Sequence, residues 1–132
     1  MTRTEFMDHF ERYLANALQR DSVTRQGDNN VQATFFDDVH IGVVTKEKGD
    51  AEVRCHIWTQ DDSRRARWRA VRTISATPPP GLTLEFRDGP RETTSYLEYN
   101  KWPNSTEKVY ASFVNPVEQA IDYFVTNQNL IP

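Results

Sequence analysis

Residues 31–59, VQATFFDDVHIGVVTKEKGDAEVRCHIWT, decide the fold of this chain, because apolar and polar side chains alternate along most of the stretch. Alternation with a period of two is typical of a β-strand that has one buried face. The stretch therefore predicts three consecutive strands. The pair Asp37-Asp38 separates the first two, and a polar hairpin turn over residues 46–50 separates the second from the third.

The third of these strands, over residues 51–57, alternates most cleanly. Cys55 belongs to its apolar face, whereas Arg54, His56 and Trp58 belong to the other face. A free cysteine on an apolar face behaves as a small hydrophobic residue, so we expect Cys55 in the core. A single cysteine also excludes an intramolecular disulfide, and the N-terminus has no apolar signal segment. We therefore expect a cytoplasmic protein.

Upstream of the strands, the apolar spacing becomes helical over residues 3–20. Thr2 and Glu5 match a capping box, in which each side chain bonds the backbone N–H of the other residue. The apolar stripe of this helix consists of Phe6, Phe10, Tyr13, Leu14, Ala17 and Leu18. Residues 21–30 are polar and have turn chemistry, so we expect them to form a connection.

Downstream, alternation predicts further strands over residues 82–86 and 94–100 and a last strand over 109–113. We expect the C-terminal helix to begin at Asn115, with Pro116 in the favoured first position. The stripe of that helix consists of Val117, Ala120, Ile121, Phe124 and Val125. These elements complete an outline of helix, strands and helix.

Residues 62–72 fit two structures. Ala66, Trp68 and Ala70 alternate with arginines, which favours a strand. The segment Asp61-Asp62-Ser63 suits a hairpin turn and suits the cap of a helix equally well. The strand is the preferred prediction, and the helix stays open.

The whole pattern predicts a single α+β domain over residues 1–132. Its sheet is mostly antiparallel, has about six or seven strands, and is flanked by N-terminal and C-terminal amphipathic helices. The composition fits such a domain, with 132 residues, 37% hydrophobic and 27% charged. No run approaches the roughly 18 apolar residues that a membrane helix needs, so we expect no contact with a membrane.

Sixteen basic and nineteen acidic residues give the chain a formal net charge of −3. This acidic balance argues against binding of nucleic acid by the whole surface. The segment Arg64–Arg72 is an exception, because Trp68 lies among its arginines as in proteins that bind single-stranded nucleic acid. Uneven charge of this kind also suits self-association, and we expect a homodimer.

The chain has no recognisable constellation for chemistry. Cys55 and His56 are adjacent on a strand and point to opposite faces, so they cannot share a metal. No phosphate-binding glycine loop and no G-x-S-x-G motif occurs in the sequence. We therefore predict no catalytic residue, no metal site and no cofactor, and we lean against an enzyme.

The leading hypothesis is a small non-catalytic protein-interaction module, such as an adaptor, a chaperone-like, an immunity or a phage accessory protein. Aromatic and arginine side chains anchor many protein interfaces. The expected partner-binding residues are Arg54, His56, Trp58, Arg65, Arg67, Arg69, Tyr96, Trp102 and Tyr110. Two alternatives remain: a small-molecule binder or enzyme that uses Arg54, His56, Tyr96 and Glu98 on a concave sheet, and nucleic-acid binding through Arg64–Arg72.

Overall fold

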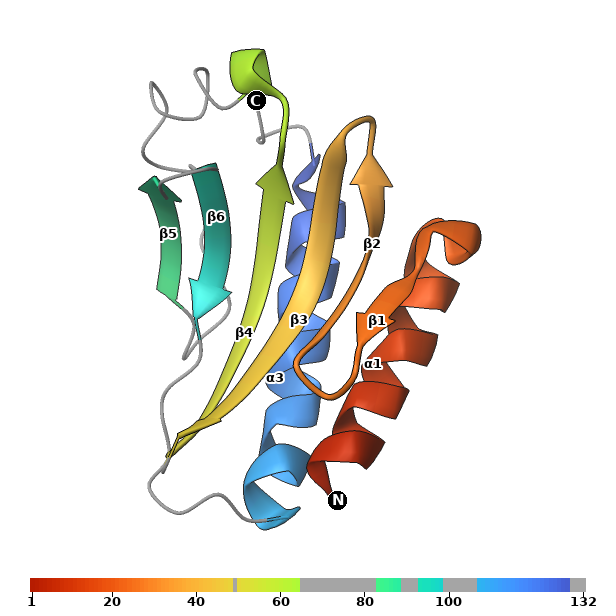
Figure 1. The fold of residues 1–132 in the computed structure, drawn as a ribbon, viewed down its shortest axis with the longest axis vertical. Helices are drawn as coiled ribbons and strands as arrows, with labels where there is room; N and C mark the ends of the chain where they lie inside the picture. Colours follow the sequence, from red (N-terminus) through yellow and green to blue (C-terminus); the bar gives the residue numbers. More distant parts are fainter. Residues whose placement is uncertain (49, 65–82, 89–92, 99–106, 129–132) are drawn as a thin grey trace.

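The computed structural model describes residues 1–48, 50–64, 83–88, 93–98 and 107–128 (Figure 1). They form an α+β fold, in which an antiparallel sheet lies between two helices in the sequence. The elements in chain order are α1 (Arg3–Ala17), the short 3-10 helix η1 (Arg20–Ser22), β1 (Thr24–Gln26), β2 (Asn30–Phe36), β3 (Val39–Lys48), β4 (Asp50–Thr59), β5 (Thr83–Asp88), β6 (Thr93–Glu98) and α3 (Glu107–Thr126).

The described strands follow the order β1-β2-β3-β4-β6-β5, and every neighbouring pair is antiparallel. The three strands predicted within residues 31–59 are confirmed as β2, β3 and β4. The hairpin between β3 and β4 is tighter than expected, because pairing continues to Lys48 opposite Asp50. The expected total of six or seven strands stays a prediction, since residues 65–82 and 99–106 lie outside the described part.

Both helices lie on one side of the sheet and run in the same direction (Figure 1). Two polar contacts show that the helices are parallel, because the second contact lies four residues after the first on both α1 and α3. His9 Nε2 lies 3.5 Å from Glu118 Oε1, and the Tyr13 hydroxyl donates to Asp122 Oδ1 at 2.7 Å. The described structure therefore has a helical layer against one face of a β-layer.

The core lies between these two layers. It takes every second residue of β2, β3 and β4, because alternate side chains of a strand point to one face. We call this the apolar face of the sheet; its fully buried side chains include Val31, Ala33, Ile41, Val43, Val53, Cys55 and Ile57. The helices contribute Phe6, Met7, Phe10, Leu14, Tyr110, Phe113, Val117, Ala120, Ile121 and Phe124. Cys55 is thus a core residue, as predicted.

The capping box at the start of α1 is confirmed, since Thr2 Oγ1 accepts from the Glu5 backbone N–H and Glu5 Oε1 accepts from the Thr2 backbone N–H. The helix is shorter than predicted and ends at Ala17. The expectation that residues 21–30 are only a connection is wrong. They contain β1, a three-residue strand whose residue Arg25 pairs in register with Val31.

The predicted strand over residues 109–113 and the predicted helix start at Asn115 are also wrong. One helix, α3, runs from Glu107 to Thr126 and contains Pro116 in its interior. Proline has no backbone N–H and usually ends a helix. Here burial overrides that preference, because Tyr110, Phe113 and Val117 lie in the core at helical spacing on both sides of the proline.

Only the beginning of the ambiguous segment 62–72 lies within the described residues. Residues 62–64 are helical, and Asp61 Oδ1 accepts a hydrogen bond from the Arg64 backbone N–H at 2.7 Å. This contact is that of a helix N-cap. The helical alternative therefore holds for the first turn, and residues 65–72 lie outside the described residues.

Candidate functional site

The second face of the sheet carries a different set of side chains from the first. We call it the polar face; its described polar and aromatic side chains on β2, β3 and β4 include Asn30, Gln32, Thr34, His40, Arg54, His56 and Trp58. Each of these residues is half-buried. The three predicted site residues Arg54, His56 and Trp58 therefore share one face, as the alternation of β4 predicted.

An aromatic pair lies at one end of the polar face. His40 on β3 and Trp58 on β4 are register partners, and their ring centroids are 4.5 Å apart with an angle of 25° between the planes. Burial lowers the pKa of His40, and the nearby Asp38 carboxylate opposes that change. The lowered pKa favours the neutral form of the imidazole that stacks on the indole.

His56 lies near the centre of the polar face, opposite Gly42 of β3. A Cβ atom at position 42 would lie 3.0 Å from His56 Nε2 and 3.1 Å from the Val31 carbonyl oxygen. A side chain at position 42 would therefore crowd the imidazole and the adjacent strand β2. Burial, and secondarily the positive charge of Arg54, lowers the pKa of His56 to about 4.

Other predicted site residues are placed only in part. Tyr96 occupies the β6 register position opposite His56, and Glu98 occupies the position opposite Arg54. The side chains of these two residues lie outside the described part of the chain. So do the remaining predicted residues Arg65, Arg67, Arg69 and Trp102.

Tyr110 does not belong to the polar face, and the strand position predicted for it is wrong. It lies in α3, its side chain is 2% exposed, and its ring lies 5.4 Å from that of Phe6 on the core side of the sheet. The Tyr110 hydroxyl donates to Glu47 Oε1. Burial and this carboxylate raise the pKa of Tyr110. Its role in the described structure is to pack α3 against the sheet.

The sequence did not reveal an ion cluster at the end of the sheet where β4 ends. Arg64 Nε lies 2.9 Å from Asp38 Oδ1, Arg64 Nη2 lies 3.5 Å from Asp37 Oδ2, and the guanidinium lies 5.3 Å from the centre of the Phe36 ring. Thr59 Oγ1 also donates to Asp38 at 2.8 Å. The adjacent acids Asp37-Asp38 were the available signal, but the sequence pattern indicated only a break between two strands.

This cluster bears on the nucleic-acid hypothesis. Arg64 is the first residue of the Arg64–Arg72 segment, and its side chain is 13% exposed. An arginine whose charge is neutralised by two carboxylates contributes little to phosphate binding. Within the described residues, the segment therefore begins with a structural arginine.

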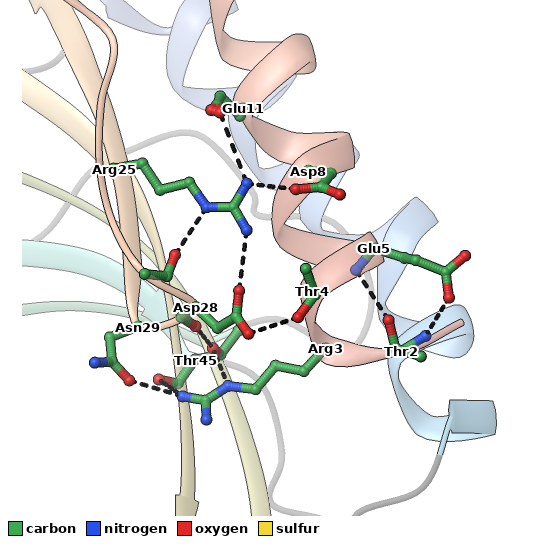
Figure 2. A network of polar contacts seen from close by, with 11 residues as sticks. Thr2, Arg3, Thr4, Glu5, Asp8, Glu11, Arg25, Asp28, Asn29 and Thr45 are labelled. Carbon is green, nitrogen blue, oxygen red and sulfur yellow. Dashed lines mark hydrogen bonds and ion pairs between the residues drawn. The ribbon is translucent and has the colours of Figure 1, made fainter.

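A second polar network joins α1 to the turn between β1 and β2 (Figure 2). Arg25 contacts Asp8 Oδ1 at 2.5 Å and Asp28 Oδ1 at 3.0 Å, and it donates to the Gly27 carbonyl oxygen at 2.8 Å. Arg3 donates to the Thr45 hydroxyl at 2.9 Å. Arg25 of β1 contacts Asp8 of α1, and Arg3 of α1 contacts Thr45 of β3. The network therefore holds the edge strand β1 against the helix.

The described residues offer little to catalysis by metals or thiols. They contain no group of three or more His, Cys, Asp or Glu residues that could hold a metal ion. Burial raises the pKa of the Cys55 thiol, so the reactive thiolate does not form at neutral pH. In the same part of the chain, neither helix has an apolar run long enough to cross a membrane.

Comparisons of the chain with protein family models, with curated proteins and with solved structures give no match. Functional inference for this chain therefore depends on its own residues.

Proposed function

We propose that the protein is a non-catalytic protein-interaction module that self-associates through the polar face of its sheet. The observation that carries the proposal is the half-buried row of His40, Trp58, His56 and Arg54 on that face. Tryptophan and arginine are enriched among the residues that dominate binding energy at protein interfaces.

The position of these side chains supports the proposal further. The described helices pack on the apolar face, so the hydrophobic core does not use the polar face. A stacked His40–Trp58 pair presents a rigid apolar surface at little cost in side-chain entropy. Arg54 adds a charge that gives such an interface orientation and specificity.

A second copy of the chain is the partner to which the proposal commits. A two-fold dimer brings the same patch of each copy together, so one face with both aromatic and cationic groups can complement itself. Arginine stacks on tryptophan faces, so the Arg54 guanidinium of one copy can stack on the Trp58 ring of the other. This arrangement predicts a dimer that weakens only modestly with salt.

Sedimentation equilibrium of the full chain tests the proposal. We expect a species of twice the mass of one chain, and we expect Trp58→Ala to weaken the dimer by about tenfold or more. The matched control is Val125→Ala, which truncates an apolar side chain that is 38% exposed on the helical layer. A protein that stays monomeric at every concentration contradicts the proposal, and so does equal weakening by the two variants.

A further inference from the structure

A groove on the helical layer has a charge opposite to that of the whole molecule. It lies on the side of α1 away from the core, where the end of the helix adjoins η1, and it has a volume of about 360 Å³. Its lining consists of Glu11, Arg12, Ala15, Asn16 and Arg20. The chain as a whole has a formal net charge of −3.

The two arginines of the groove keep their charge available. Arg12 is exposed and makes no ion pair or hydrogen bond within the described residues. Arg20 has only a neutral side-chain partner there, since its Nη2 donates to Asn16 Oδ1 at 3.2 Å. Both guanidinium groups can therefore bind an anion without first breaking an internal ion pair.

The one acid of the groove does not cancel this charge. Glu11 Oε1 lies 3.7 Å from Arg25 Nη1, in the network that joins α1 to β1 (Figure 2). The positive charge of Arg25, which does not line the groove, therefore compensates the negative charge of the Glu11 carboxylate. Arg12 and Arg20 remain as two cations beside the apolar methyl group of Ala15.

The chemistry of the groove favours carboxylates over phosphates. Guanidinium groups bind both kinds of anion in a planar, forked geometry. The groove, however, adjoins the C-terminal end of α1, where the helix dipole is negative and disfavours a dianion more than a monoanion. The Ala15 methyl group and the arginine stems also suit the methylene groups of a glutamate side chain.

We propose that this groove binds the carboxylates of an acidic, extended segment of a partner protein. Arg12 and Arg20 bind the carboxylates, and Ala15 contacts the aliphatic part of the segment. The proposal is independent of self-association through the polar face, because the groove lies on the helical layer and shares no residue with that face. One surface can fail its test while the other passes.

NMR titration of the full chain at low salt tests the proposal, with a blocked Glu-Glu-Leu-Glu peptide as the probe. We expect the amide signals of Ala15 and Asn16 to shift with this peptide and not with a Gln-Gln-Leu-Gln peptide. Arg12→Gln and Arg20→Gln should each weaken binding by about two- to fivefold, as expected for exposed charge pairs. Lys46→Gln is the matched control, because it removes one positive charge at an exposed site on β3.

Three results would overturn the proposal. The first is the absence of any shift at α1 with the acidic peptide. The second is equal weakening by Lys46→Gln, which would mean that net charge alone drives binding. The third is a response of the groove to pyrophosphate without one to the peptide, which would assign it to phosphate ligands.

Discussion

Ile57 and Trp58 are neighbours on β4, yet they lie in opposite environments. Ile57 is fully buried between the sheet and the helices, whereas Trp58 is half-buried on the polar face and stacks on His40. The same alternation separates Cys55 from His56. The core and the proposed interface therefore use alternate residues of one strand.

The largest effect should follow from truncation on the apolar face. Ile57 is fully buried, so Ile57→Ala removes buried methyl and methylene groups and leaves a cavity. We expect this change to lower the free energy of unfolding by roughly 2–5 kcal/mol. Urea denaturation followed by circular dichroism measures it. A loss no greater than that of Trp58→Ala would break the comparison between the two faces.

Acid should destabilise the protein through His56. In the unfolded chain this imidazole has a pKa of 6.5, and folding lowers it to about 4, because burial disfavours the charged form. The folded state is therefore not penalised above pH 6.5. It loses stability as the pH falls from 6.5 to 4, by about 3 kcal/mol in total.

Urea denaturation at pH 7 and at pH 4.5 checks this expectation. The unmodified protein should lose more stability between the two pH values than His56→Gln does, because the variant has no imidazole to protonate at this position. His40 also titrates with a lowered pKa, but both proteins contain it. Parallel losses in the two proteins would show that His56 is readily protonated in the folded state.

Gly42→Ala should cost stability through contacts on the polar face. The new Cβ would lie 3.0 Å from His56 Nε2 and 3.1 Å from the Val31 carbonyl oxygen, closer than ordinary van der Waals contact. We expect a loss of about 1–3 kcal/mol, as is typical of overpacking. If His56 is the group that must move, Gly42→Ala should cost less in a His56→Ala background. A double-mutant cycle measures that difference, and additive effects would contradict it.

The smallest effect on stability should come from Trp58→Ala. Removal of a half-buried indole that stacks on His40 should cost about 1–2 kcal/mol. Differential scanning calorimetry at a concentration where the chain is monomeric measures this cost. A larger loss than that of Ile57→Ala would place Trp58 in the core of the protein and remove it from the proposed interface.

Local sequence signals predicted the centre of the fold well. The alternation of residues 31–59 specified β2, β3, β4 and the face of each side chain, because one buried face imposes a period of two. The capping box similarly identified the start of α1. In these segments local preference and tertiary packing agree, so a single sequence suffices.

Prediction failed where tertiary contacts override local chemistry. Pro116 indicated a helix start, but the helical spacing of Tyr110, Phe113 and Val117 extends α3 by eight residues before Asn115. That spacing was visible in the sequence, and the weight given to proline concealed it.

The candidate sites show the same limit. The aromatic and basic residues of β4 were predictable, because all of them follow from one alternation. The pairing of Arg64 with Asp38 was not, since it joins residues 26 positions apart through the geometry of a turn. The α1 groove was also hidden, because it forms only where the chain turns from α1 into η1 and places Arg20 beside Arg12 and Asn16.

The burial of Cys55 has a practical consequence for spectroscopy. The chain has one cysteine, and in the folded protein its thiol is fully buried with a raised pKa. Maleimides and other thiol reagents react with the exposed thiolate, so they should leave Cys55 unmodified under native conditions. A new cysteine at exposed Val125 would then be the one reactive thiol, and a fluorophore or spin label could be attached there without replacing the native residue.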